Sequence, residues 1–245
     1  MEIFDPACLP EYVYSALNLK PPPAPRSIHP LADPKGTFRK ELTRCQQCFK
    51  SRGPGVNLKT CSACKSDMYC SKECQTSAWK TRKVTCALNQ LAYTIPLVDE
   101  MQELRVFVTK HQPTIASAGV HALDVMADPS RAEQDLLLIC LRSRPDSRRS
   151  ETAFFVTAAA AVPIDTFPKQ QVMREQLKLA SDETKRHPGM AGALLVYLFD
   201  FASGATNLCP VGFPQASPTP PNNPAIALPH WKEYLTANLN EGIIL

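Results

Sequence analysis

Seven of the ten cysteines of this 245-residue chain lie within the 42 residues that end at Cys86. They form two Cys-x2-Cys pairs, then two cysteines four positions apart, then one more. A Cys-x2-Cys turn directs two thiolates toward one point, and one helical turn brings residues four apart to the same face. Zinc requires four such donors in a tetrahedron. The spacing therefore predicts a zinc-binding module that contains these cysteines: Cys45, Cys48, Cys61, Cys64, Cys70, Cys74 and Cys86.

The alternative for so many cysteines is a disulfide-linked secreted module, which needs an oxidising compartment. The N-terminal sequence MEIFDPACLP contains two acidic residues and no apolar segment, so a signal peptide is not indicated. We therefore expect an intracellular protein of the nucleus or cytoplasm that is not secreted. The scattered Cys8, Cys140 and Cys209 are expected to be buried free thiols. No apolar run reaches the roughly eighteen residues that a membrane span requires.

Residues between the cysteines resemble the MYND zinc finger. Tyr69-Cys70-Ser71, Cys74-Gln75 and Trp79-Lys80 stand where this family has the same residue types, and the resemblance covers about a sixth of the chain. It implies two zinc ions that are bound in an interleaved manner. The first ion would be held by Cys45, Cys48, Cys70 and Cys74. The second would be held by Cys61, Cys64, Cys86 and the residue at position 82.

Position 82 departs from the family pattern, because Arg82 stands where the family has a histidine ligand. Arginine stays protonated and offers no lone pair to a metal. The fourth ligand of the second site is then open between water, a distant histidine such as His111 or His121, and a shifted local group; alternatively, the site is weak or empty. An incomplete shell is also a feature of catalytic zinc. Here three thiolates lower the Lewis acidity of the ion, and no carboxylate adjoins position 82 to act as a base.

The resemblance also implies a ligand for the module. MYND fingers bind short proline-containing peptides of the Pro-x-Leu-x-Pro type, and the matching positions in this chain are Ser62, Gln75 and Trp79. Gln75 and Trp79 are four residues apart, so they share one face of a helix. The indole offers a flat apolar surface to a preformed polyproline strand. Trp79 could also belong to the small core of the module, and the two roles are compatible.

Several elements must position these residues. Ser71 is predicted to cap a helix that begins near Lys72 and carries Cys74, Trp79 and Arg82. The module is expected to occupy residues 45–86 and to end at Cys86. Residues 1–43 are proline-rich, with the run Pro21-Pro22-Pro23-Ala24-Pro25. We expect them to form an extended, disordered arm that serves as a linker or as a ligand for a proline-binding domain.

Residues 87–245 have the pattern of an α+β domain with an antiparallel sheet. Apolar periodicity predicts two helices over 87–127. Pro113 is expected to end the first, and Thr114 is expected to cap the second. Apolar runs at 136–141 and 152–162 predict a β-hairpin, and residues 168–187 predict a helix. A strand at 194–201 is expected to pair with residues 207–213 after the Ser203-Gly204 turn. The chain is predicted to end in an amphipathic helix with Trp231, Tyr234, Leu235 and Leu239 on one face.

Charge gives a weaker indication of partners. The formal net charge is +4, and residues 40–86 contain ten Lys or Arg against three Asp or Glu. The hairpin loop 142–150 adds four arginines, which indicates either a nucleic-acid or targeting patch or simply a solvated loop. The module lacks the Cys2His2 pattern of DNA-reading fingers, so we do not expect nucleic acid as a direct ligand. No membrane association is expected.

These observations favour a zinc-binding adaptor whose finger binds proline-rich protein segments. SET-domain lysine methyltransferases also contain MYND fingers, but their Asn-His and Gly-Glu-Glu-Leu motifs do not occur in this sequence. We therefore predict no catalytic residue and no enzyme activity. The alternatives are an unrecognised enzyme or regulatory domain in residues 87–245, whose role is unknown, and a nucleic-acid-associated regulator.

Overall fold

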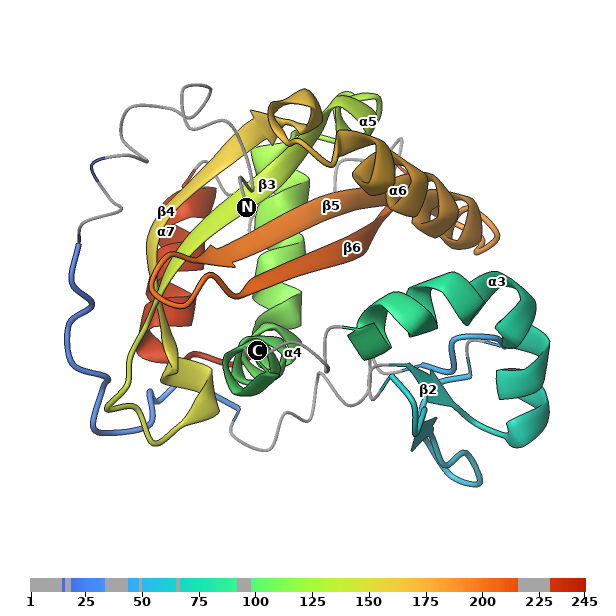
Figure 1. Ribbon diagram of the computed structural model, residues 1–245, viewed down its shortest axis with the longest axis horizontal. Helices are drawn as coiled ribbons and strands as arrows, with labels where there is room; N and C mark the ends of the chain where they lie inside the picture. Colours follow the sequence, from blue (N-terminus) through green and yellow to red (C-terminus); the bar gives the residue numbers. More distant parts are fainter. Residues whose placement is uncertain are drawn as a thin grey trace.

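The computed structural model describes residues 15, 19–33, 44–48, 50–64, 67–91, 98–215 and 230–245. Two parts of the chain carry the regular structure. Residues 44–91 form the cysteine-rich module, and residues 98–245 form an α+β region around a four-stranded sheet (Figure 1). This arrangement confirms the predicted fold class.

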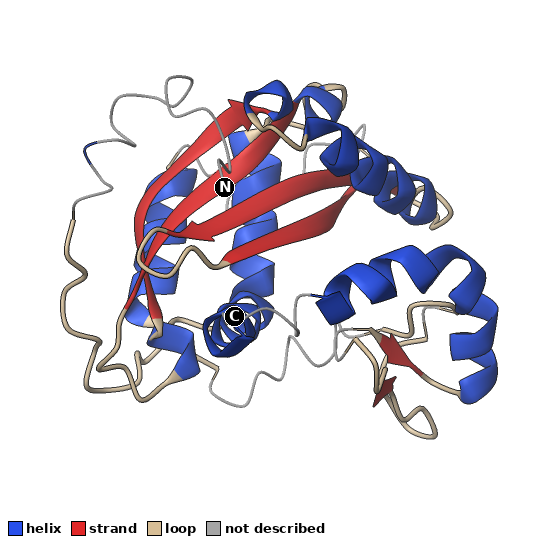
Figure 2. Ribbon diagram, in the orientation of Figure 1, coloured by secondary structure: helices blue, strands red, loops and turns tan. Residues whose placement is uncertain are grey.

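The cysteine-rich module consists of a short hairpin and one long helix (Figure 2). Strand β1 (Lys59–Thr60) pairs antiparallel with β2 (Met68–Tyr69), and helix α3 spans Lys72–Leu91. The hydroxyl Oγ of Ser71 accepts a hydrogen bond from the backbone N–H of Cys74 at 3.2 Å, which confirms the predicted cap. The helix continues beyond Cys86 to Leu91, because the following ALNQL segment contains no helix breaker.

The apolar core of the module is small. Its buried non-cysteine members are Leu58, Tyr69 and Ala78, and the buried cysteines supply the rest: Cys45, Cys61, Cys64 and Cys86. A core of this size cannot offset the conformational entropy of about 40 ordered residues. The module therefore depends on cross-links between its cysteines for stability.

Helix α4 (Val98–Ala122) is one continuous helix, contrary to the predicted break. Pro113 lies inside it, and Thr114 is buried within the helix and does not cap one. Proline removes one helical hydrogen bond. Packing compensates for this loss, because Phe107 and Ile115 on either side of the proline are fully buried in the main core. Further along, Gly119 passes close to the sheet, where an added Cβ would lie 2.9 Å from a methyl carbon of Leu194.

The sheet has the strand order β4-β3-β5-β6. Strand β3 (Asp135–Ser143) pairs antiparallel with β4 (Phe154–Pro163), and β5 (Met190–Asp200) pairs antiparallel with β6 (Thr206–Pro214). Both hairpins match the prediction. The central pair β3–β5 is parallel, however, so the sheet is mixed and not purely antiparallel. The reason is that β4 returns the chain to the edge of the sheet where β3 begins. Helix α6 (Gln170–Thr184) then carries the chain past β3, so that β5 starts at the same edge and runs in the same direction.

Helices cover both faces of this sheet (Figure 1). Met173 and Leu177 of α6 pack on one face, and α4 with α7 (Trp231–Glu241) packs on the other. Leu235 and Leu239 of α7 are fully buried, as the amphipathic pattern predicted. Burial on both faces explains why the strands are continuous apolar runs. Short helical turns join the larger elements: α5 (Arg131–Gln134), η2 (Ser150–Thr152) and η3 (Ile164–Thr166).

The end of β5 is fixed by the fully buried carboxylate of Asp200. Its Oδ1 accepts hydrogen bonds from the backbone N–H of Ser143 at 3.1 Å and of Ala202 at 3.2 Å. Its Oδ2 accepts from Ser203, through the backbone N–H at 3.1 Å and the hydroxyl at 2.6 Å. One side chain thus joins the end of β3 to the β5–β6 turn.

Most of the predicted arm, residues 1–43, lies outside the described residues. Its described part, residues 19–33, runs along the α+β region on the side of β4 and α7 (Figure 1). The backbone N–H of Asp33 donates to the carbonyl of Ile244 at 2.8 Å, and Arg149 binds two carbonyls further upstream. This stretch is therefore attached to the α+β region.

Candidate metal centre

The first group of thiols joins the start of the module to its middle. Cys45 and Cys48 lie on one turn, Cys70 follows β2, and Cys74 lies in the first turn of α3. Their Sγ atoms all lie within 4.8 Å of one another. The Sγ of Cys70 is 3.4 Å from that of Cys48 and 3.5 Å from that of Cys74. Four thiols at one point are the donor set of a closed structural zinc site.

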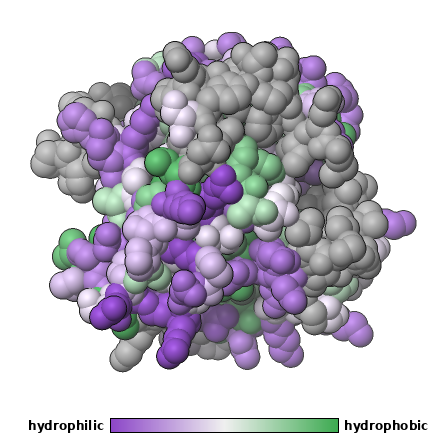
Figure 3. All heavy atoms as spheres, turned by 60° about the vertical axis from the view of Figure 1, so that its left-hand side comes forward, coloured by the Kyte–Doolittle hydropathy of each residue, from purple (hydrophilic) through white to green (hydrophobic). Residues whose placement is uncertain are grey.

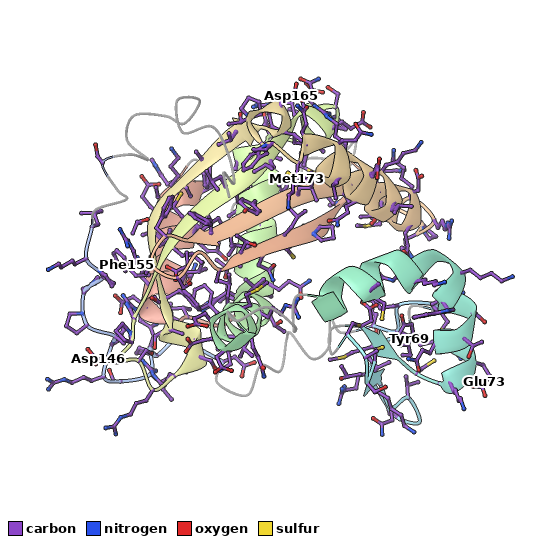
Figure 4. The ribbon with its side chains drawn as sticks, viewed as in Figure 1. Tyr69, Glu73, Asp146, Phe155, Asp165 and Met173 are labelled. Atoms are coloured by element: carbon purple, nitrogen blue, oxygen red, sulfur yellow. The ribbon has the colours of Figure 1, made fainter. Side chains whose placement is uncertain are left out.

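The second group contains three buried thiols. Cys61 and Cys64 lie on the turn after β1, and Cys86 projects from α3 three turns beyond Cys74. Their Sγ atoms also lie within 4.8 Å of one another. Tyr69 lies in the chain between Cys64 of the second group and Cys70 of the first, and Figure 4 shows sulfur atoms close to it. The two groups fit two zinc ions, in the interleaved order that the sequence predicted.

Backbone hydrogen bonds favour the metal-binding form of two of these thiols, Cys45 and Cys61. Burial raises the pKa of Cys45, but backbone hydrogen bonds from Cys48 and Cys70 outweigh burial and lower the pKa to about 6. Burial likewise opposes ionisation of Cys61, and the backbone of Cys64 reverses the effect and lowers the pKa. Zinc binds the thiolate and not the thiol. The turns therefore favour the metal-binding thiolate at Cys45 and Cys61, whereas the side-chain hydrogen bond with Cys48 raises the pKa of Cys70 to about 12.

Arg82 contacts polar groups at the position where a histidine ligand was expected. Its Nη2 donates to the side-chain oxygen of Gln46 and lies 3.7 Å from Oδ1 of Asp67. Asp67 in turn accepts a hydrogen bond of 3.4 Å from the hydroxyl of Tyr69. This network ties α3 to the Cys45–Cys48 turn and to β2, so Arg82 makes by polar contacts a link that a metal ligand would make by coordination.

No histidine joins either thiol group among the described residues. His111 lies in α4, where its Nε2 is 2.8 Å from the carbonyl oxygen of Glu151. His121 lies at the end of the same helix. Neither therefore supplies a fourth ligand to the three-thiol group in this structure.

The predicted peptide-binding residues lie beside the second thiol group. Ser62 is exposed on the turn between Cys61 and Cys64. Gln75 is half-buried, and its Nε2 donates to the Sγ of Cys61 at 3.5 Å. Trp79 follows one turn later on α3 and is 45% exposed, so it does not belong to the core of the module. Gln75 thus connects the predicted peptide-binding face to a metal-ligand candidate.

Sequence patterns did not show the polar network around Arg82. The signal was present in part, because Arg82 was the one departure from an otherwise complete motif. Its partners Gln46 and Asp67 lie 36 and 15 residues away in the chain, and nothing in their spacing indicates an ion pair. The arginines of loop 142–150 were predicted to form a solvated loop or a nucleic-acid or targeting patch. In the structure, Arg144 is buried and Arg149 binds the arm.

A model of the MYND finger family matches residues 42–86. This chain contains a MYND finger. MYND fingers are protein–protein interaction modules, and the two cysteine groups of this one fit two zinc ions. The matched residues agree with the predicted module.

Several curated proteins are similar to this chain through the MYND finger region. A SET and MYND domain-containing protein of Dictyostelium discoideum is 38% identical over 63 residues, which are 24% of this chain and 11% of that protein. SET domain-containing protein 14 of Caenorhabditis elegans is 50% identical over 42 residues, 17% of this chain and 9% of that protein. Histone-lysine N-methyltransferase ASHR1 of Arabidopsis thaliana is 42% identical over 74 residues, 30% of this chain and 12% of that protein.

The chain thus matches only about a tenth of the length of these relatives. The matches give no evidence of a catalytic SET domain in this chain. No solved structure matches it. Among the described residues, no helix combines the length and the apolar character needed to cross a membrane.

Proposed function

We propose that this protein is a zinc-dependent adaptor whose MYND finger binds short proline-containing segments of other proteins. The observation that carries the proposal is the exposure of Trp79. A small zinc module has little apolar area with which to build a core. This finger nevertheless leaves its one tryptophan 45% exposed on α3, outside the buried cluster. A large exposed aromatic side chain of this kind is typical of binding surfaces.

The surroundings of Trp79 suit a proline-rich ligand. A proline peptide is already extended before it binds and loses little entropy, and its rings pack against flat aromatic surfaces. Gln75, one helical turn before Trp79, can offer an amide to the carbonyl groups of such a peptide. Ser62 adds a hydroxyl from the neighbouring turn. Zinc-bound thiolates behind this face keep the helix and the turn in fixed positions.

The finger also carries positive charge after metal binding. Residues 40–86 have a formal charge of +7, from ten basic and three acidic residues. Two zinc ions bound by seven thiolates add −3, which leaves +4. A cationic face of this size favours peptides with acidic residues beside the prolines. The free thiols and the thiolate-rich finger further support a reducing, intracellular location.

The test is peptide binding by the full-length chain and its Trp79→Ala variant. Loss of a central tryptophan from a peptide groove costs about 2 kcal/mol or more, so the affinity for a Pro-x-Leu-x-Pro peptide is expected to fall at least about 30-fold. Ser77→Ala is the matched control, because Ser77 is exposed on the same helix. Zinc content should stay constant in both variants. Equal affinity of wild type and Trp79→Ala would show that the face containing Trp79 does not bind the peptide.

A further inference from the structure

The described part of the arm is held by specific hydrogen bonds. The Nη2 of Arg149 donates to the carbonyl oxygens of Pro25 at 2.7 Å and of Ser27 at 3.2 Å. Arg149 is itself placed by Glu151, whose Oε1 is 3.9 Å from Nη1 of the arginine. Glu151 is anchored by Lys110 of α4 at 2.7 Å. The donor that binds the arm therefore belongs to a chain of charged groups fixed to the core helix.

A cleft of about 540 Å³ lies beside this attachment, between β4, α7 and the arm. Its floor includes Phe155 of β4, and the guanidinium of Arg144 lies over the Phe155 ring at 5.1 Å. Arg144 is only 6% exposed and donates through Nη1 to the carbonyl of Asn240 at 2.9 Å. Its buried Nε finds no hydrogen-bond partner among the described residues. Pro22 of the arm and Asn240 of α7 also line this cleft.

The views of the molecule agree with this description. Figure 4 places Phe155 on the side of the sheet along which the arm runs. Figure 3 brings this side forward and shows apolar side chains gathered in the middle of a largely hydrophilic face. An aromatic floor with a polar rim is the usual form of a peptide-binding surface.

The chemistry of this surface complements a proline-rich segment. Proline has no N–H, so the run from Pro21 to Pro25 has five carbonyl acceptors and a single amide donor, on Ala24. A surface that binds such a segment must supply donors, and Arg149 supplies them here to the carbonyl oxygens of Pro25 and Ser27. Pro21 and Ala24 are half-buried, whereas the two prolines between them are exposed. A spacing of three residues is one turn of a polyproline helix.

We propose that the surface formed by β4, α7 and loop 142–150 is a second proline-peptide-binding site, and that residues 21–27 of the same chain are its resident ligand. This gives residues 98–245 a binding role of their own. It also keeps the arm away from other readers of proline peptides, including the finger. The proposal does not depend on the proposed function of the finger, because it rests on the hydrogen bonds of Arg149 with the arm and on the cleft that Pro22 shares with Phe155 and α7.

The first test measures how firmly the arm is bound in the full-length chain. Arg26 is exposed within the bound segment, and cleavage after it by trypsin requires this segment to leave the surface. Lys20 precedes a proline and resists trypsin. We expect Arg149→Gln to release the fragment 1–26 about tenfold faster than wild type, as followed by mass spectrometry at early times. That factor corresponds to about 1.4 kcal/mol.

The matched control is Arg148→Gln, which removes the same charge from an exposed neighbour in the same loop and should leave the rate unchanged. If Arg149→Gln lowers the melting temperature, faster cleavage could come from a less stable fold, and a second variant is needed. Replacing Pro22 and Pro23 by glycine loosens the arm and leaves the α+β region intact, because glycine raises the entropy of the released segment. This double variant should also be cleaved about tenfold faster.

The second test supplies the ligand from outside. A labelled peptide of residues 19–33 is titrated against the chain, and binding is followed by fluorescence anisotropy. The tethered arm competes at an effective concentration on the order of millimolar. The peptide should therefore bind the Pro22→Gly/Pro23→Gly chain at least about tenfold more tightly than wild type. Adding Arg149→Gln to that chain should abolish the gain, and adding Trp79→Ala should not.

The outcomes separate this proposal from that for the finger. If fragment 1–26 appears at one rate in wild type and both arm-loosening variants, and the peptide does not bind, the second site does not exist. If peptide binding is lost with Trp79→Ala and kept with Arg149→Gln, the finger is the receptor, and the second site is overturned while the finger proposal gains support. Loss of peptide binding with Arg149→Gln but not with Trp79→Ala supports the second site. The proposal for the finger is then decided by the Pro-x-Leu-x-Pro peptide and Trp79→Ala.

Discussion

The MYND finger and the α+β region obtain their stability in different ways. The finger buries three apolar side chains besides its cysteines, whereas the α+β region has two apolar clusters, one on each face of its sheet. The finger therefore depends on metal, and the α+β region depends on packing. The comparison shows why the first could be recognised from a few residues and the second could not. A metal site fixes residue types at set spacings, while a core accepts many apolar combinations.

Removal of one metal ligand should have the largest effect and should be confined to the finger. Cys70→Ser takes a thiolate from the four-cysteine group, and structural zinc contributes on the order of 10 kcal/mol to such modules. We expect the amide NMR signals of residues 44–91 to collapse to unfolded positions, while those of 98–215 remain. A variant that kept its zinc and its native finger spectrum would contradict the assignment of Cys70 to the first site.

In the α+β region, acid should weaken the core through His111, whereas in the finger it protonates the thiolates that bind zinc. Burial lowers the pKa of His111 to about 4, below the ordinary value of 6.5. The folded state then holds a neutral imidazole while the unfolded chain takes up a proton. The stabilisation is complete above pH 6.5 and is lost as the pH falls toward 4, which gives a loss of about 2 kcal/mol by pH 5.

His111→Phe is the variant that sharpens this prediction. It keeps a ring against Phe107 and removes the titrating group. Its free energy of unfolding, measured with urea, should depend less on pH between 6.5 and 5 than that of wild type. The same slope in both chains would show that another group titrates. His230→Phe is a suitable control, since His230 is exposed.

The smallest effect is expected from a substitution of Arg82 that makes the two zinc sites of the finger more alike. Arg82→His restores the residue type that the family has at this position, at the cost of the contacts with Gln46 and Asp67. We expect the second zinc to resist chelator on the order of tenfold better, because a fourth protein ligand completes its shell. Zinc per chain, measured by elemental analysis at increasing chelator concentration, checks this. Wild type that retains both ions as firmly as the variant would show that its shell is already complete.

Sequence patterns predicted the local elements better than their assembly. The hairpins β3–β4 and β5–β6, helix α6 and the Ser71 cap follow from periodicity and turn residues close together in the chain. The parallel pairing of β3 with β5 joins residues about 60 positions apart, and no local pattern encodes the direction of the second strand. The predicted helix break at Pro113 was wrong for a related reason. Burial of its neighbours in the core outweighed the local preference of proline.

The candidate sites differ in the same way. The metal-binding residues were predictable because coordination chemistry restricts both their type and their spacing. The surface around Arg149 was not predictable, because it is assembled from an arm, a loop and a helix that are far apart in the sequence. The four arginines of loop 142–150 were predicted to form a solvated or nucleic-acid-binding loop. The structure shows that Arg144 binds α7 and Arg149 binds the arm.

The parallel β3–β5 pair has a consequence for synthesis of the protein on the ribosome. Strand β3 can pair with β4 as soon as residue 163 has emerged, but its other edge pairs only with β5, which ends at Asp200. Between Ser143 and Asp200 the ribosome adds 57 residues, which takes about 3 to 11 s at usual translation rates. During this interval the LLLICL segment presents an unpaired edge, the kind of surface that chaperones protect from aggregation. The nascent chain is therefore most exposed after its finger is complete and before its sheet can close.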